Sequence, residues 1–388
     1  MTASILAFLY WFGVAALFYT FLGYQLLIQI LSKLCPKKPA IRDWTSPPSL
    51  CVVVAACNEE KRIGTRINNL LASDYPSLRI LVVSDGSTDS TAQRVIDIKN
   101  QKIQLIVSPN RSGKPACLNL ALAQVREEIV VFADARQRFA TDTISRLVAH
   151  FSDPKIGAVS GSLEIDPSVS TTGQGVDAYW RLERSLRSAE SKLDSCIGCT
   201  GAVYAIRREL FQTIPEDTIL DDVVIPMKIA MQGYRVIFEP AALAIDPQPL
   251  EPKLECSRKT RTLAGNFQML TRYPEWLLPW RNRLWWQLIS HKYLRLSGPP
   301  VLLLVFFANL GMAGIPLYRF LFAAQFIFYL LAFAGMIFGS RKYALLHMPA
   351  GFVFLNAMIV RGFLHFLKGT PTGVWTQVQT DSRFQGRR

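Results

Sequence analysis

Polar side chains follow three of the apolar runs in this sequence, at the point where each run ends. The three groups are Cys57-Asn58-Glu59-Glu60, Asp85-Gly86-Ser87-Thr88-Asp89 and Asp134-Ala135-Arg136-Gln137. Their carboxylate and amide groups could accept hydrogen bonds from a ligand or hold a metal ion. Any one group could instead belong to a turn or cap the next helix. Three groups in the same relative place indicate a shared ligand site.

Two further features could do chemistry. Lys114 follows Gly113 at the start of an expected helix, and a cation at a helix N-terminus is a suitable phosphate site. Asp221 and Asp222 open another expected helix. A carboxylate within reach of a hydroxyl is what general-base catalysis requires. The same pair could cap the helix, and both roles can hold together because a cap position also fixes the carboxylate's orientation.

The elements that must position these residues alternate between strand and helix. Continuous apolar runs, typical of strands buried on both faces, occur at Leu50–Ala55, Ile80–Ser84, Ile103–Val107 and Ile129–Phe132. Helical stretches separate them near Arg62–Leu71, Ser90–Lys99 and Lys114–Gln124. This order predicts an α/β domain with a mostly parallel sheet and right-handed crossovers. In such sheets ligands bind beyond the C-terminal ends of the strands, which is where the polar groups lie.

Later helices are expected at Gly175–Leu193, Asp222–Gln232 and Pro252–Tyr273. Gly233 follows the second of them in the position that ends many helices. The segment Leu277–His291 mixes tryptophans with arginines, as helices lying in a membrane interface do.

The two ends of the chain are apolar. The sequence has 388 residues, of which 50% are hydrophobic. Three runs, Met1–Ser32, Leu296–Tyr318 and Phe320–Ser340, contain no charged residue apart from the chain terminus, and each can supply the ~20 residues that cross a bilayer. A cleaved signal peptide is the competing interpretation of the first run. That run begins Met-Thr-Ala-Ser without a basic residue and is too long, so we expect an uncleaved anchor.

The last apolar segment, Tyr343–Val360, is shorter than the others. It contains His347, Pro349 and Asn356. Basic residues precede it at Arg341-Lys342 and follow it in the tail, and such residues collect on the cytoplasmic side. Because a third full span would put the tail outside, we expect residues 343–367 to form a re-entrant or interfacial segment.

The chain is basic, with 43 Lys and Arg against 29 Asp and Glu and a net charge of +14. Nucleic-acid binding is one interpretation of such a charge, but no nucleic-acid module is recognisable, and we expect no nucleic-acid partner. Cations gather near anionic lipids and in cytoplasmic loops. Lys33, Lys37, Lys38 and Arg42 directly follow the first apolar run. We therefore expect a multi-pass protein of the inner (plasma) membrane with a cytoplasmic central domain.

The seven cysteines are expected to be packing residues or to line the site. Cys196 and Cys199 form a single C-x-x-C without a second pair, which is a weak zinc signal. A cytoplasmic domain also keeps its thiols reduced.

The motifs resemble those of family 2 inverting glycosyltransferases. The stretches that carry the resemblance are Val52–Glu60, Leu81–Ser90 and the G-K-x-x-x-L-N run from Gly113 to Asn119. With the apolar ends, the sequence is similar to the membrane-bound branch that includes cellulose, hyaluronan and poly-N-acetylglucosamine synthases. The resemblance implies the nucleotide-diphospho-sugar transferase fold, an α/β fold with a mostly parallel mixed sheet, flanked by transmembrane helices. It also implies a UDP-sugar donor, a glycan or lipid-linked acceptor and contact with the lipid bilayer.

This interpretation divides the chain into five parts. Residues 1–34 form the anchor, 35–275 the cytoplasmic glycosyltransferase domain, 276–295 an interfacial amphipathic helix, 296–367 the C-terminal membrane region and 368–388 a basic tail.

The resemblance also implies roles for residues on the donor side. It assigns the nucleotide to Asp85 and Glu59, with Ala56 and Asn58 lining the pocket. Lys114 would contact the diphosphate, as would Arg261, which matches the arginine of the family's Q-x-x-R-W motif. The glutamine and tryptophan of that motif are replaced here by Arg258 and Thr262, which weakens the case for a long polymer channel.

The expected metal ion is magnesium or manganese. The family holds it through a D-x-D motif, but Asp134-Ala135-Arg136 keeps only the first acid. Arginine cannot ligate a cation, although it can pair with phosphate. Either the metal binds through Asp134 and the diphosphate alone, or Arg136 replaces part of its charge. We expect the metal to be retained.

On the acceptor side, Asp222 matches the family's catalytic base. Cys199 and Gly201 match a small-residue turn beside the acceptor, and Asp221 and Arg258 also fall on that side.

Two functions fit these residues. The first is a transferase that builds a surface or secreted glycan, by processive synthesis or by single transfer to a lipid. The second is a non-catalytic nucleotide-binding membrane subunit, suggested by the altered D-x-D motif. Lys114, Asp222 and Arg261 together favour the enzyme.

Overall fold

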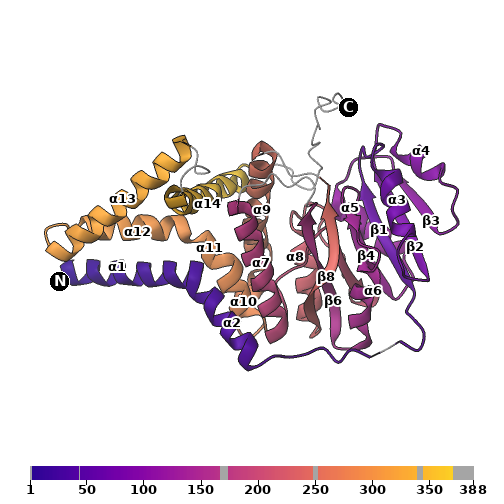
Figure 1. Ribbon diagram of the computed structural model, residues 1–388, viewed down its shortest axis with the longest axis horizontal. Helices are drawn as coiled ribbons and strands as arrows, with labels where there is room; N and C mark the ends of the chain where they lie inside the picture. Colours follow the sequence, from indigo (N-terminus) through magenta and orange to yellow (C-terminus); the bar gives the residue numbers. More distant parts are fainter. Residues whose placement is uncertain (1, 43, 167–173, 248–251, 339–343, 370–388) are drawn as a thin grey trace.

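The structure, a computed structural model, describes residues 2–42, 44–166, 174–247, 252–338 and 344–369. Figure 1 shows a sheet domain at one end of the molecule and a group of apolar helices at the other. Helices α7 (Gln174–Leu193) and α9 (Pro252–Arg272) stand between the two. The expected loop cations Arg341-Lys342 and the tail from residue 370 lie outside the described residues.

The sheet has eight strands within the described ranges, in the order β3-β2-β1-β4-β7-β6-β8-β5. Neighbours from β3 to β4 run parallel, and β7 is antiparallel to both β4 and β6. The mostly parallel mixed sheet expected from the sequence is confirmed. The strands are β1 Leu50–Ala56, β2 Leu78–Asp85, β3 Ile103–Ser108, β4 Ile129–Asp134, β5 Arg138–Phe139, β6 Ile156–Ile165, β7 Val203–Arg207 and β8 Arg235–Asp246.

The strand register brings the polar strand ends together. Ala55 of β1 pairs with Asp134 of β4, and Ala56 pairs with Ser84 of β2, one residue before Asp85. Parallel strands share one carboxyl edge, so the loops that follow β1, β2 and β4 meet there, as the sequence predicted.

Both faces of the sheet are covered. Alternate residues of β1, β2 and β4 enter two separate apolar clusters, one typified by Val53 and Phe132 and the other by Val52 and Val131. This arrangement explains why the strands read as continuous apolar runs. The covering helices of the domain are α3 Ile63–Leu71, α4 Thr91–Ile96, α5 Lys114–Gln124, α6 Thr143–Ala149 and α8 Asp221–Met231.

Three helices in the described ranges are long and apolar enough to cross a membrane. The first runs through α1 (Thr2–Phe18), the π-helical turn η1 (Tyr19–Gly23) and α2 (Tyr24–Leu34). The second is α13 (Pro316–Phe338) and the third is α14 (Ala344–Leu367). These helices support membrane association of the chain.

The expected span over Leu296–Tyr318 is not one straight helix. That region holds only α12 (Gly298–Leu310), 13 residues long, which meets the preceding helix at a bend of 61°. The cause is Gly298-Pro299-Pro300. Proline lacks the N–H that would continue the earlier helix, and it is favoured in the first turn of a new one.

The expected single helix over Leu277–His291 is wrong in its first half. A 3₁₀ turn, η4 (Pro274–Leu277), is followed by irregular chain to Leu284. Asn282 stabilises this irregular chain, since its side chain donates to Trp276 O (2.8 Å) and accepts from Leu284 N (2.9 Å). The helix starts at Trp285 and continues through α10 (Trp285–Leu288), the π turn η5 (Ile289–Tyr293) and α11 (Leu294–Leu296).

Helix α14 is unbroken from Ala344 to Leu367, which a re-entrant loop would not be. Its C-terminal half packs on α9, where the Phe363 and Phe366 rings lie 5.1 and 6.2 Å from the Phe267 ring. Helix α13 runs back from the end of the bundle near the N-terminus towards the sheet domain (Figure 1). Because the C-terminal half of α14 packs on α9 beside the sheet domain, we propose that α14 lies along the membrane surface.

We predict that residues at the two ends of the bundle label from opposite sides. A membrane-impermeant maleimide in sealed vesicles should reach Lys368→Cys from the same side as the exposed native Cys35. Gly314→Cys, in the exposed turn between α12 and α13, should react from the other side. Labelling of Lys368→Cys together with Gly314→Cys would show that α14 crosses the membrane.

Candidate active site

Lys114, the first residue of α5, joins three segments that are distant in the sequence. Its Nζ donates to Asp134 Oδ1 (2.8 Å) and to Gly201 O (3.3 Å), and lies 3.7 Å from Asp221 Oδ2. Burial alone would lower the pKa of Lys114, but the neighbouring Asp134 and Asp221 outweigh it and raise the pKa. Lys114 is therefore held as a cation between two carboxylates.

Asp85, at the end of β2, holds the loop that precedes Lys114. Its Oδ1 accepts from Ser112 N (2.7 Å) and its Oδ2 accepts from Gly113 N (2.8 Å). Gly113 adopts φ +93°, a conformation that favours glycine. The Asp85 side chain is fully buried at 0% exposure. In this structure its hydrogen bonds therefore go to the loop backbone.

Asn58 and Asp89 interlock the loops after β1 and β2. Asn58 has a left-handed φ of +56°, and its Oδ1 accepts from Thr88 N (2.8 Å). Asp89 accepts from Glu60 N (3.1 Å) and from Thr91 N (3.0 Å) at the start of α4. The turn and cap roles that were possible from the sequence are thus present at these two residues.

Glu59 lies between these loops and Asp134. Its Oε2 pairs with Arg62 (3.2 Å), and its side chain is 22% exposed. Burial raises the pKa of Glu59, with Arg62 opposing that shift and nearby Asp134 adding to it. Ala56, at the end of β1, is buried and can offer only backbone to a ligand.

Arg136, in place of the second acid of a D-x-D motif, is committed to another carboxylate. Its guanidinium forms an ion pair with Asp246 at the end of β8, and Gln137 Nε2 donates to the same carboxylate (3.2 Å). Much of the positive charge of Arg136 is therefore neutralised within the protein.

Few side chains in the candidate site could ligate a divalent metal ion. Among the described residues no group of three or more His, Cys, Asp or Glu side chains could hold a metal ion. Asp134 has one oxygen bonded to Lys114, and its side chain keeps 33% exposure. Such a site fits a magnesium or manganese ion that takes most of its ligands from a diphosphate and water.

Asp222 follows Asp221 at the start of α8 and faces the small-residue turn. A Cβ on Gly201 would lie 3.0 Å from Asp222 Oδ2, and Cys199 N donates to Asp222 O (2.7 Å). The Asp222 side chain is partly exposed and makes no hydrogen bond within the described ranges. Burial and the adjacent Asp221 raise the pKa of Asp222 to about 6, against the opposing cations Lys114, Arg187 and Lys292.

Helix α9 is fixed against the chain that leads into Asp221. Gly265 packs on Leu220, and Gln268 Oε1 accepts from Ile219 N (3.0 Å). Arg261 lies one turn before Gly265 and is half-buried. Its guanidinium has no ion pair or hydrogen bond to any residue that the structure describes. Arg258 is exposed on the same helix.

The structure also places Arg187 of α7 and Lys292 of η5 close enough to affect Asp222. Sequence reasoning missed both, because neither residue belongs to a motif that the sequence shows. Only the packing of α7 and η5 against the sheet domain turns them towards the site.

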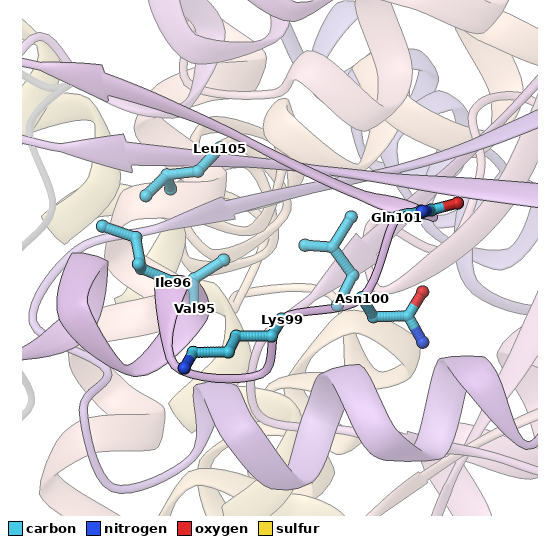
Figure 2. A pocket seen from close by; sticks show the side chains of 7 residues that line it. Val95, Ile96, Lys99, Asn100, Gln101 and Leu105 are labelled. Atoms are coloured by element: carbon cyan, nitrogen blue, oxygen red, sulfur yellow. The ribbon is translucent and has the colours of Figure 1, made fainter.

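Figure 2 shows a hollow in another part of the domain, between α4 and β3. It is lined by Val95, Ile96, Lys99, Asn100, Gln101, Ile103 and Leu105. It contains no carboxylate and none of the residues above, so it does not extend the candidate site.

Part of the sheet domain matches a known family. Residues 51–214 match the family described as Glycosyl transferase family 2. The chain is 27% identical over 262 residues to beta-monoglucosyldiacylglycerol synthase of Synechocystis sp., covering 61% of this chain and 52% of that protein. It is 26% identical over 294 residues to poly-beta-1,6-N-acetyl-D-glucosamine synthase of Staphylococcus aureus, covering 74% and 63%. The match therefore spans about half to two-thirds of the length of these relatives.

A solved structure is similar over nearly the whole chain. It is the mannosyltransferase PcManGT from Pyrobaculum calidifontis in complex with GDP-Man and Mn²⁺. The TM-score is 0.70 at 25% identity, with 93% of this chain and 99% of that chain covered. The fold is thus that of the GT-A glycosyltransferases, and the nucleotide-diphospho-sugar transferase fold expected from the sequence is confirmed.

We predict that Asp85→Asn loosens the loop before Lys114. An amide can accept only one of the two backbone hydrogen bonds and turns a donor towards the other N–H. The free energy of unfolding should fall by about 1–3 kcal/mol, measured as a lower melting temperature of the purified protein. Asp97→Asn, at an exposed position in the same domain, is the control. Equal melting temperatures for the two variants would contradict the structural role of Asp85.

Proposed function

On the premise that this chain is a transferase with a glycosyl transferase family 2 domain, we propose that it transfers a sugar with inversion from a UDP-sugar to a glycan or lipid-linked acceptor. One observation carries the proposal. Asp222 is a carboxylate deep in the domain that keeps an accessible edge and makes no side-chain hydrogen bond within the described ranges. It lies beside the Lys114 and Asp134 cluster.

On the donor side, Lys114 at the N-terminus of α5 supplies positive charge and free backbone N–H groups for the diphosphate. We propose that Arg261 adds a second cation from α9, since its guanidinium has no partner within the described ranges. Glu59 and the backbone near Ala56 and Asn58 hold the nucleoside. Asp85 contributes through the loop that it fixes rather than by direct contact, because it is fully buried.

We propose that magnesium or manganese binds through the accessible oxygen of Asp134 and the donor's diphosphate. When bound, the ion supplies positive charge to the leaving diphosphate. The similar solved structure is a complex with GDP-Man and Mn²⁺, which supports this proposal. Arg136 is held by Asp246, so it is a poor replacement for the metal charge.

In the reaction, Asp222 accepts the proton of the acceptor hydroxyl as that hydroxyl attacks the anomeric carbon. Attack from the face opposite the diphosphate inverts the configuration. Gly201 leaves room for the sugar beside the carboxylate, because any side chain there would contact Asp222. Cys199 holds the backbone of Asp222, Asp221 holds Lys114, and Arg258 contacts the acceptor.

The position of the chain in the cell is also a proposal. We propose that it resides in the inner (plasma) membrane with its sheet domain in the cytoplasm, since Lys33 lies in the last turn of the first membrane helix and Lys37 and Arg42 follow that helix. The boundaries at residues 34, 275, 295 and 367 are proposed with it.

A donor panel tests the function directly. UDP-sugars and GDP-mannose are offered to the purified protein with magnesium, with manganese and with a chelator, and nucleotide release is measured. We expect release from one UDP-sugar, lost on chelation. Release from GDP-mannose alone would contradict the UDP donor, an unchanged rate after chelation would contradict the metal, and no release from any donor would contradict the proposal.

We predict that Asp222→Asn lowers transfer by ~100-fold or more, the usual contribution of a general base. Donor binding, measured by calorimetry, should stay near the wild-type value because Asp222 lies on the acceptor side. Asp217→Asn, on the exposed loop before α8, is the matched control. Near-normal turnover of Asp222→Asn would remove Asp222 from the role of base.

We predict an acid limb in the pH dependence of transfer with a midpoint at about 6. Only the ionised carboxylate can accept a proton, so the rate should fall as the pH drops through this value. The measurement is kcat at saturating donor from pH 5 to 8. A midpoint near 4, the ordinary value of an aspartate, would contradict the raised pKa of Asp222.

A further inference from the structure

A line of buried polar side chains connects membrane helix α2 with helix α7. Tyr24 OH donates to Glu190 Oε1 (2.7 Å), and Glu190 Oε1 lies 3.0 Å from His291 Nδ1. His291 Nε2 lies 3.0 Å from Glu183 Oε1. Tyr24, Glu190 and His291 are 0–1% exposed and Glu183 is 8% exposed. Such groups are costly to bury unless each is paired, as they are here.

The two contacts of His291 fix the number of protons in this line. Carboxylate oxygens only accept hydrogen bonds, and a neutral imidazole has one N–H. Contacts from both ring nitrogens to Glu190 and Glu183 therefore require a second proton, either on the ring or on one glutamate. The imidazolium form makes both contacts charge-assisted, which is the stronger arrangement.

From Glu183 the series of polar contacts continues through Arg187 to the turn that faces Asp222. Glu183 Oε1 lies 3.6 Å from Arg187 Nε, one helical turn further along α7. Arg187 donates from a terminal nitrogen to Thr200 Oγ1 (2.9 Å), next to Gly201. Thr200 is fixed in turn, since its hydroxyl donates to Gly161 O (2.7 Å). Arg187 is thus held at two points beside the turn that faces Asp222.

The backbone of the membrane-side helices is adapted to this line. His291 lies in the π turn η5, and Tyr24 directly follows the π turn η1. The two turns meet where Tyr19 OH contacts Ser290 Oγ (2.8 Å) and accepts from Trp286 Nε1 (2.8 Å). A π turn inserts an extra residue into a helix and is frequent at functional sites.

We propose that Arg187 is a positioning residue for the proposed base: it holds a positive charge beside the Thr200-Gly201 turn that faces Asp222, and the buried line Tyr24–Glu190–His291–Glu183 holds Arg187 in place from the membrane side. The inference rests on the proposed function, since it assigns Arg187 a role in the same reaction. It makes the geometry of the membrane helices a condition for proton transfer in the sheet domain.

Other groups also act on Asp222 and must be considered with Arg187. Asp221 opposes its ionisation, whereas Lys114 of α5 and Lys292 of η5 favour it. The Tyr204 phenol of β7 and the Cys199 thiol also lie near it. Arg187 itself faces Glu183, Cys196, Cys199 and Asp222. Lys114 is shared between Asp134 and Asp221, and Arg187 is a second cation whose removal should change Asp222.

The first test separates the charge of Arg187 from its geometry. Arg187→Met should move the acid limb of kcat upwards by about one pH unit, with little change in the donor KM. Arg187→Lys keeps the charge but loses the two-point attachment, so the limb should stay in place while kcat falls several-fold. Arg184→Gln, at a partly exposed arginine of α7 that pairs with Glu164, is the control. An unmoved acid limb in Arg187→Met would overturn the proposal.

The second test addresses the membrane end of the line. Tyr24→Phe removes one hydroxyl and should lower kcat about two- to fivefold, the effect of one buried hydrogen bond, with an unchanged donor KM. Tyr10→Phe removes a hydroxyl from the same membrane segment, and Tyr10 has no hydrogen bond to this line. Equal kcat for the two variants would overturn the link to the membrane helices.

A third measurement does not depend on transfer. The melting temperatures of the wild type, Arg187→Met, Asp222→Asn and the double variant define a double-mutant cycle. The effects of the two substitutions should be non-additive if the two side chains interact. Additive effects would overturn the proposal even in an inactive preparation. A wild-type protein that releases no nucleotide from any donor, yet shows a non-additive cycle, would instead refute the proposed function and leave the Arg187–Asp222 interaction established.

Discussion

The site depends on one buried cation. Lys114 bonds to Asp134 from the end of β4, to the carbonyl of Gly201 before β7, and lies beside Asp221 at the start of α8. Segments separated by up to about a hundred residues therefore converge on a single ammonium group. Its own position depends on Asp85, which fixes the preceding loop through two backbone hydrogen bonds. Removing the ammonium group would leave several carboxylates close together without a counter-charge, which is strongly unfavourable in a buried site.

Much of this arrangement could be predicted from the sequence, because each buried strand of the sheet is recognisable from its own residues. Runs such as Val52–Ala55 and Val82–Ser84 are apolar throughout, and residues of this type form strands covered on both faces. Their polar ends then meet at one edge whatever the details of packing. Lys114 and Asp222 were found for the same reason, since both open helices at that edge. The specific partners could not be found, because the bond from Lys114 to Gly201 spans 87 positions.

The helices formed by the apolar parts of the chain were less predictable. A run of apolar residues indicates that a helix forms, but it does not show where that helix ends. Long helices formed over residues 2–34 and Pro316–Phe338, whereas Gly298-Pro299-Pro300 broke the apolar run between them. Arg187 and Lys292 show the same limit. A cation on an amphipathic helix has identical local sequence whether it meets lipid headgroups or a catalytic carboxylate. The contacts of α7 with α2 and β8 decide between these cases, and such contacts have no local signature.

The adjacent acids Asp221 and Asp222 illustrate how burial assigns different roles to like residues. Asp221 lies 3.7 Å from the Lys114 ammonium, while Asp222 faces Gly201 and keeps an accessible edge. The negative charge of Asp221 and the loss of solvent raise the pKa of Asp222 to about 6. A carboxylate of this pKa is mostly ionised at neutral pH, yet it is more basic than an exposed aspartate by about two units. Proton transfer from a sugar hydroxyl is thereby made less unfavourable. Three cations limit the shift, so the base gains strength without being protonated at rest.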